Sequence, residues 1–215
     1  MELQDLANAV EKGKVKIVKQ LTQEALDQGF SAQDILNSMI GAMGIVGDNF
    51  RDNKIFVPEM LVAAKAMSAG TAILEPIMAG AGVEPMGTVV IGTVRADLHD
   101  IGKNLVTMMV KGVGATVYDL GVDVPDATFV EKAEEYQADI VILSALLTTT
   151  MPMLNDVIQE FVKQGVRDKY YIMVGGAPVN QEYADEIGAD AYTADAGSCA
   201  EHVKKVLAEM KAKKG

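Results

Sequence analysis

The pattern of hydrophobic and polar positions changes character near residue 80. Before that point apolar residues recur at helical spacing, and from residue 88 short β-branched runs alternate with amphipathic segments. This pattern predicts an N-terminal four-helix bundle over residues 1–83 and an α/β domain over residues 84–215. The glycine-rich stretch 80–87 breaks both periods and is expected to be a linker that lets the bundle move.

Turn and capping signals give the expected bounds of each element. The bundle helices are expected from Leu3 to Val10, from Val15 to Leu26, from Ser31, with Asp34 in capping-box spacing, to Phe50, and from Pro58 through Glu59 to Gly80. The expected strands are 88–94, 116–119, 140–144, 170–175 and 191–194, and the helices after them begin at Asn104, Pro125, Pro152, Gln181 and Ser198. Five such units predict a flavodoxin-like (Rossmann-type) parallel sheet with strand order 2-1-3-4-5.

An Asp-x-His-x-x-Gly motif, Asp97 to Gly102, follows the first expected strand and contains His99, one of two histidines in the chain. Ligands of open parallel sheets bind beyond the carboxyl ends of the strands. The spacing lets the Asp97 carboxylate bond one ring nitrogen of His99 and leaves the other for a metal or a proton. Taken alone, the motif is better explained by a helix capped by Asp97 or Asp100 beside a solvated histidine.

Two other strand ends carry polar or small residues. A run of hydroxyls, Ser144 to Thr150, follows the third expected strand and could bind a polar ligand, while Gly175 and Gly176 follow the fourth and would let a bulky group approach the backbone. Each segment alone is also typical of an ordinary turn. Because the expected strand order places the first and third strands side by side, His99 and Ser144 are predicted to be neighbours.

Composition excludes several classes of protein. The formal net charge of −11 leaves no basic face for nucleic acid. No signal peptide and no apolar run of spanning length are recognised, so we expect a cytoplasmic protein that binds neither nucleic acid nor membrane. A single cysteine, Cys199, excludes a thiolate metal cluster and agrees with a reducing compartment. The second histidine, His202, is expected to be a solvated residue of the last helix.

Taken together, the Asp-x-His-x-x-Gly, Ser-x-Leu and Gly-Gly segments behind a helical bundle resemble the cobalamin-binding module of methionine synthase. The resemblance is closest to the small corrinoid proteins of methylamine, methanol, betaine and aryl-ether methyltransferase systems. Segments 46–50, 56–59 and 63–67 resemble the helical signature of the same family, so the resemblance covers essentially the whole chain.

The resemblance implies that the chain binds cobalamin or a related corrinoid, with His99 as the axial cobalt ligand. Asp97 would accept the other ring N–H, and Thr150 stands where the family has a serine as the third member of a proton relay. The remaining residues implied in cofactor binding are Gly102, Ser144, Leu146, Thr148, Gly175 and Gly176 along the nucleotide tail, and Phe56 above the corrin. For Phe56, a place in the bundle core is an equal alternative.

The resemblance also implies a function in one-carbon metabolism. Cobalt(I), as in cob(I)alamin, would accept a methyl group from a substrate-specific methyltransferase, and methylcobalamin would pass it to a second methyltransferase acting on tetrahydrofolate or a thiol. A reductive activation protein would be a further partner, and methylamine use and O-demethylation both fit such a carrier. Three alternatives stay open: a subunit of an adenosylcobalamin-dependent mutase, a cobalamin-binding sensor, and a cofactor-free signalling domain of the same fold.

Overall fold

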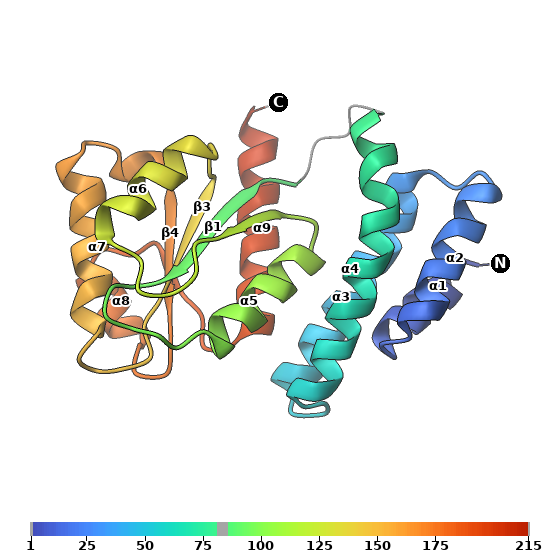
Figure 1. Ribbon diagram of the computed structural model, residues 1–215, viewed down its shortest axis with the longest axis horizontal. Coiled ribbons are helices and arrows are strands. Elements are labelled where there is room, and N and C mark those ends of the chain that lie inside the picture. The colour runs from blue at the N-terminus through green and yellow to red at the C-terminus, as the bar shows by residue number, and fades with distance from the viewer. Residues whose placement is uncertain (1, 81–85, 215) are drawn as a thin grey trace.

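The computed structural model describes residues 2–80 and 86–214 as a helical bundle that lies beside a layered α/β domain (Figure 1). The bundle consists of α1 (Leu3–Glu11), α2 (Val15–Asp27), α3 (Ala32–Arg51) and α4 (Val57–Gly80). The α/β domain consists of β1 (Thr88–Thr93), α5 (Ile101–Gly112), β2 (Thr116–Asp119), α6 (Asp126–Glu135), β3 (Ile140–Ser144), α7 (Met151–Lys163), η1 (Arg167–Lys169), β4 (Tyr171–Gly175), α8 (Gln181–Glu186), β5 (Ala191–Tyr192) and α9 (Ala196–Lys214). The predicted architecture is confirmed, while the predicted boundary between residues 83 and 84 lies outside the described residues.

The five strands form one parallel sheet in the order β2-β1-β3-β4-β5, as predicted for a flavodoxin-like fold. At the carboxyl end of the central pair, Thr93 of β1 is in register with Ser144 of β3, and Ser144 is in register with Gly175 of β4. The loops that follow these three strands therefore leave the sheet at the same edge.

Side chains that alternate along each strand divide the core of the α/β domain into two layers. On β1, Val89 and Ile91 belong to the cluster that includes residues of α5 and α9, whereas Val90 belongs to the cluster formed with α6, α7 and α8. Figure 1 shows α5 and α9 between the sheet and the bundle. The three central strands, β1, β3 and β4, are buried on both sides, which explains their continuous apolar runs.

The bundle shares its hydrophobic core with the face of the sheet that α5 and α9 cover. Met39 and Met43 of α3 belong to the same cluster of buried residues as Val203 of α9. A Cβ atom added at Gly197 of α9 would lie 3.0 Å from the carbonyl oxygen of Gly47 of α3, so the two helices approach closely. This shared core does not support the expectation, drawn from the linker, that the bundle moves freely.

Several element ends differ from those predicted. The edge strand β5 ends at Tyr192 and not at residue 194, and α9 begins at Ala196 because the Asp195 carboxylate accepts the backbone N–H of Ser198. The predicted cap of α3 is confirmed, since the hydroxyl oxygen of Ser31 accepts the N–H of Asp34. The other shifts are of one to three residues, as is usual for element ends.

The prediction that no apolar run reaches spanning length was wrong for α4. Residues Val57–Met78 are long and apolar enough to cross a membrane by length and composition, with a mean hydropathy of 1.3. One such helix is weak evidence for a membrane span, because a helix packed inside a bundle passes the same test. Its buried residues include Met60, Ala63, Met67 and Leu74, which lie in the shared core.

Candidate functional site

The histidine motif forms a loop between β1 and α5 in which the main chain and the ring of His99 are both held. The ring Nδ1 lies 2.7 Å from Oδ1 of Asp97, and the backbone N–H of His99 donates to the same oxygen at 3.0 Å. The hydroxyl of Thr93 donates to the backbone carbonyl of His99 at 2.9 Å. With the proton on Nδ1 donated to Asp97, the lone pair of Nε2 has no hydrogen-bond partner among the described residues, and the half-exposed ring is open to a ligand.

Asp97 is fully buried, and its second carboxylate oxygen is also satisfied. Oδ2 accepts the backbone N–H of Leu146 and the hydroxyl of Thr150, each at 2.7 Å. Burial by itself would raise the pKa of Asp97, but the hydrogen bonds from Thr150, Leu146 and His99 hold that pKa well below its usual range. The carboxylate is therefore ionised at neutral pH and favours the His99 tautomer that carries its proton on Nδ1.

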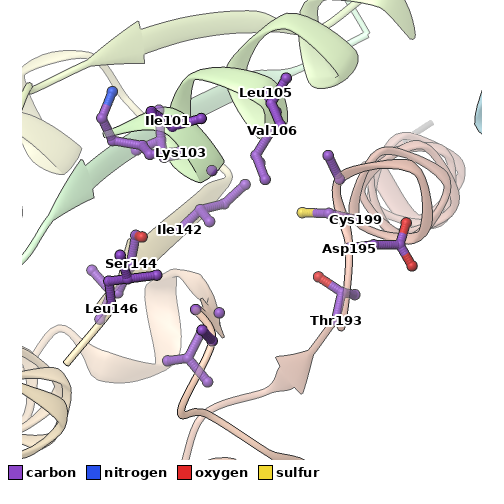
Figure 2. Close-up of a pocket in the computed structure, with 18 of the residues that line it drawn as sticks. Ile101, Lys103, Leu105, Val106, Ile142, Ser144, Leu146, Thr193, Asp195 and Cys199 are labelled. Atoms are coloured by element: carbon purple, nitrogen blue, oxygen red, sulfur yellow. The ribbon is translucent and has the colours of Figure 1, made fainter. Parts of the chain in front are cut away.

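A cavity of about 720 Å³ opens beside His99 at the carboxyl edge of the sheet and extends toward α9 (Figure 2). Of the predicted site residues, those that line it are His99, Gly102, Ser144, Leu146, Gly175 and Gly176. The neighbourhood of His99 and Ser144 expected from the strand order is thus present. Buried side chains of Ile91, Ile142 and Met173 also line the cavity, so it penetrates the core of the domain.

The wall contributed by the segment from β5 to α9 brings two small polar groups to the cavity. In Figure 2 the sulfur of Cys199 and the hydroxyl of Thr193 point inward, whereas the carboxylate of Asp195 points away. Burial raises the pKa of the Cys199 thiol to about 11, so the thiol is neutral at physiological pH. The sequence offered no signal for this position beyond an apolar face of the last helix.

The glycines of the site are required for different reasons. Gly176 has a φ of +133°, and a Cβ there would lie 1.8 Å from the carbonyl oxygen of Ala145, so the backbone itself demands glycine. At Gly102 a Cβ would meet no atom of the described residues within 4 Å outside its own helix and its chain neighbours. Gly102 therefore leaves open a space beside His99 that the protein does not fill, which suits a bulky ligand.

Four predicted residues lie outside the described lining of this cavity: the buried Asp97 and Thr150, and also Thr148 and Phe56. Thr148 is exposed and is not part of the described lining. Phe56 is 64% exposed, so its alternative place in the bundle core was wrong. It lines a separate hollow of about 390 Å³ at the α3–α4 connection. Phe50, predicted as a helix end and as part of the segment 46–50, lines both hollows.

The expectation that His202 is a solvated residue was also wrong. Its Nε2 lies 2.9 Å from the hydroxyl oxygen of Tyr171, and burial lowers its pKa. His202 lines a small hollow near the start of β4, at the edge of the sheet opposite to His99. Within the described residues, no group of three or more histidine, cysteine or carboxylate side chains could hold a metal ion.

Comparison with known proteins identifies the family. Residues 87–203 match one model of the B12 binding domain and residues 2–75 match a second. A dimethylamine corrinoid protein of Methanosarcina acetivorans is 41% identical over 96% of this chain and 97% of its own length. A corrinoid protein of Desulfitobacterium hafniense is 40% identical over 95% and 97%. This chain belongs to the B12-binding corrinoid proteins.

Solved structures agree with this family. A cobalamin-binding protein from Desulfitobacterium hafniense superposes on this corrinoid protein with a TM-score of 0.81 and 26% identity, covering 95% of this chain and 98% of that one. A chain of the methanol:cobalamin methyltransferase complex from Methanosarcina barkeri gives a TM-score of 0.83 at 28% identity, covering 97% and 82%. The protein therefore binds cobalamin or a related corrinoid, and the residues of the cavity fit such a group.

Proposed function

We propose that this protein is a methyl carrier whose corrinoid cobalt is held from below by Nε2 of His99. The observation that carries the proposal is the buried Asp97 carboxylate that fixes the His99 ring at the mouth of a deep, largely apolar cavity. When bound, the cobalt of the corrinoid would supply the chemistry, by accepting a methyl group in its reduced state and releasing it to an acceptor.

The chain's own contribution is to orient the ligand and to hold its proton. Asp97 keeps the proton on Nδ1 of His99, which leaves Nε2 as the electron-pair donor. Thr150 and Leu146 fix the other carboxylate oxygen, so the carboxylate cannot rotate away from the ring. We propose Thr150 as the third member of a relay that lets the proton on Nδ1 respond to changes in axial ligation.

The remaining predicted residues are proposed to hold the nucleotide tail and the corrin. The cavity between His99 and Cys199 would receive the tail, with Gly102 and Gly175 allowing close approach and Ser144 and Leu146 lining its entrance. Thr148, which is exposed, would act at the rim. Phe56, on the neighbouring hollow, would cover the upper face of the corrin and exclude water.

We further propose that the partner supplying the methyl group is a substrate-specific methyltransferase, and that a methylamine is the first donor to test. Two comparisons support this proposal. The relative from Methanosarcina acetivorans is a dimethylamine corrinoid protein, and one structural neighbour is a chain of a methanol:cobalamin methyltransferase complex. A second methyltransferase and a reductive activation protein complete the proposed set of partners.

The test is a transfer assay with the reconstituted, reduced protein and purified methylamine- and methanol-specific corrinoid methyltransferases. We expect the absorption of reduced cobalt to disappear when the correct transferase and its donor are present together, and not when either is left out. Methyl iodide serves as a chemical donor that reports whether the cobalt is competent. A protein that reacts with methyl iodide but with neither transferase would contradict the proposed donor classes.

A further inference from the structure

Two non-glycine residues with left-handed backbone conformations lie on adjacent loops directly beside the histidine motif. Ala96, which precedes Asp97, has a φ of +64°, and Asp123, on the loop between β2 and α6, has a φ of +53°. Such a conformation is unfavourable for an alanine in particular. Strained residues of this kind persist only where surrounding contacts hold them, and they occur at functional sites.

The contacts that hold Ala96 come from its own turn, in which the N–H of Asp97 donates to the carbonyl of Val94 at 3.2 Å, and from Asp123. The backbone N–H of Ala96 donates to Oδ1 of Asp123 at 2.7 Å. In return, the backbone N–H of Asp123 donates to the backbone carbonyl of Asp97 at 2.9 Å. The two bonds enclose the strained residue and fix the main chain on both sides of it, immediately before the side chain that orients His99.

A second carboxylate, at the end of β2, contacts the helix that follows the histidine loop. Asp119 forms an ion pair with Lys103, whose side chain is 2% exposed, on the first turn of α5. The other oxygen of Asp119 accepts the N–H of Gly121 at 2.9 Å. Asp123 therefore hydrogen-bonds to the start of the histidine loop, residues 96–100, and Asp119 forms an ion pair just beyond its end.

We infer that Asp123 is a positioning residue for the axial histidine. It lies outside the described lining of the cavity and acts through Ala96 and Asp97, by setting the direction in which Asp97 holds the ring of His99. This inference rests on the proposed function for its consequence at cobalt, but the geometry it describes belongs to the protein alone. It predicts that the hydrogen-bond acceptor at position 123 matters, and not its charge.

Two variants separate the acceptor from the backbone conformation. Asp123→Asn keeps a side-chain oxygen and tolerates a positive φ, whereas Asp123→Gly tolerates the positive φ and removes the acceptor. Both changes are at an exposed side chain, so both proteins are expected to fold, which circular dichroism and thermal unfolding check.

The first readout uses protein without corrinoid. Long-range ¹⁵N–¹H spectra of the His99 ring report which nitrogen carries the proton and whether the ring has one environment. We expect one Nδ1–H form in the wild type and in Asp123→Asn, and a mixture of forms together with faster amide exchange at Ala96 in Asp123→Gly. An Asp123→Gly spectrum identical to that of the wild type would overturn the inference without touching the proposed function.

The second readout uses ¹⁵N-histidine-labelled protein loaded with hydroxocobalamin and reduced to cobalt(II). Electron paramagnetic resonance then shows a two-line splitting from a bound ¹⁵N-imidazole, distinct from the three-line splitting given by the benzimidazole nitrogen of the cofactor itself. We expect the ratio of histidine-bound to histidine-free cobalt to fall about fivefold in Asp123→Gly, the size of one lost hydrogen bond, with unchanged total corrinoid. Asp123→Asn should match the wild type, and an equal fall in Asp123→Asn would overturn the inference. A wild type without the two-line ¹⁵N splitting would instead overturn the proposed function.

Discussion

At the scale of single residues, the hydrogen bonds of the site meet at the carboxylate of Asp97. A buried carboxylate is costly unless its oxygens are hydrogen-bonded, and here both oxygens accept bonds from the backbone or side chains of His99, Leu146 and Thr150. These bonds keep the carboxylate ionised, so a negative charge lies beside the imidazole of His99. They also make the stability of the free protein sensitive to each member of the network.

Thr150→Val removes one donor to that charge while keeping the shape of the side chain. We expect the free energy of unfolding at pH 7 to fall by about 2 kcal/mol, the range for a hydrogen bond to a charged group. Thr150→Ser retains the hydroxyl and is the matched control, with an expected loss below about 1 kcal/mol. Urea unfolding of the protein without corrinoid measures both values, and an equal loss in the two variants would contradict the assignment.

The lowered pKa of Asp97 predicts how its contribution depends on pH. Because the folded pKa lies below the unfolded value of about 3.9, the stabilising effect is fully present above pH 5 and is lost as the pH falls toward the folded pKa. The stability advantage of the wild type over Asp97→Asn should therefore shrink by about 1 kcal/mol between pH 7 and pH 3. An advantage that stays constant over this range would show that Asp97 is not held ionised.

Cys199 gives a residue-level probe of the cavity. Since its pKa is raised to about 11, the reactive thiolate is scarce at pH 7, and its fraction increases about tenfold for each pH unit up to pH 10. We expect slow labelling by Ellman's reagent at pH 7, faster labelling at pH 9, and protection at both pH values by bound hydroxocobalamin. Equal rates with and without the corrinoid would place the ligand elsewhere.

At the scale of elements, the histidine site shows what local sequence could predict. The Asp97–His99 hydrogen bond follows from a spacing of two residues, and the proximity of Ser144 follows from the strand order. The exact contacts of Thr150 and Leu146 with Asp97 depend on how the loop after β3 folds back, which no periodicity encodes. Thr150 was predicted from the residues only as the last of a run of hydroxyls, and its place in the relay was implied by family resemblance.

Other residues were predicted wrongly or missed because their surroundings depend on contacts between residues far apart in the chain. The partner of His202 is Tyr171, which is 31 positions away in the chain. Phe56 was taken as possible core, yet it lies exposed at the α3–α4 connection. The acceptor role of Asp123 depends on two loops 27 positions apart, so neither loop alone reveals it.

The first turn of α5 offers a direct test of the space beside His99. Gly102→Ala should stabilise the free protein by up to about 1 kcal/mol, because alanine is the better helix former and its Cβ meets open space. The same methyl group should weaken corrinoid retention after desalting. Gly176→Ala is the contrasting variant and should destabilise the free protein, since its Cβ would collide with the backbone of Ala145. A Gly102→Ala protein that retains corrinoid as the wild type does would contradict the fit.

At the scale of the whole molecule, the bundle and the sheet are joined by one continuous hydrophobic cluster. The close crossing of α3 and α9 at Gly47 and Gly197 and the ion pair between Arg51 and Glu201 both bridge the two parts. One bundle residue near this junction, Phe50, contributes to the described wall of the cavity. The two parts therefore form one structural unit around the site.

This shared core predicts that the protein without corrinoid unfolds in a single cooperative step. Helical circular dichroism, to which the helices of the bundle and of the α/β domain contribute about equally, and tyrosine fluorescence, which reports on the α/β domain alone because all six tyrosines lie after residue 117, should give the same midpoint. Separate midpoints for the two signals would show that the bundle is independent of the sheet.

The central claim is that His99 binds the cobalt of a corrinoid held in the cavity at the carboxyl edge of the sheet. The most direct measurement is the absorption spectrum of the protein after incubation with hydroxocobalamin and desalting, compared with His99→Ala and with His202→Ala as the matched histidine control. We predict stoichiometric retention with an imidazole-ligated spectrum in the wild type and in His202→Ala, and loss of that spectrum in His99→Ala alone. An unchanged spectrum in His99→Ala, or a wild type that retains no corrinoid, would contradict the account.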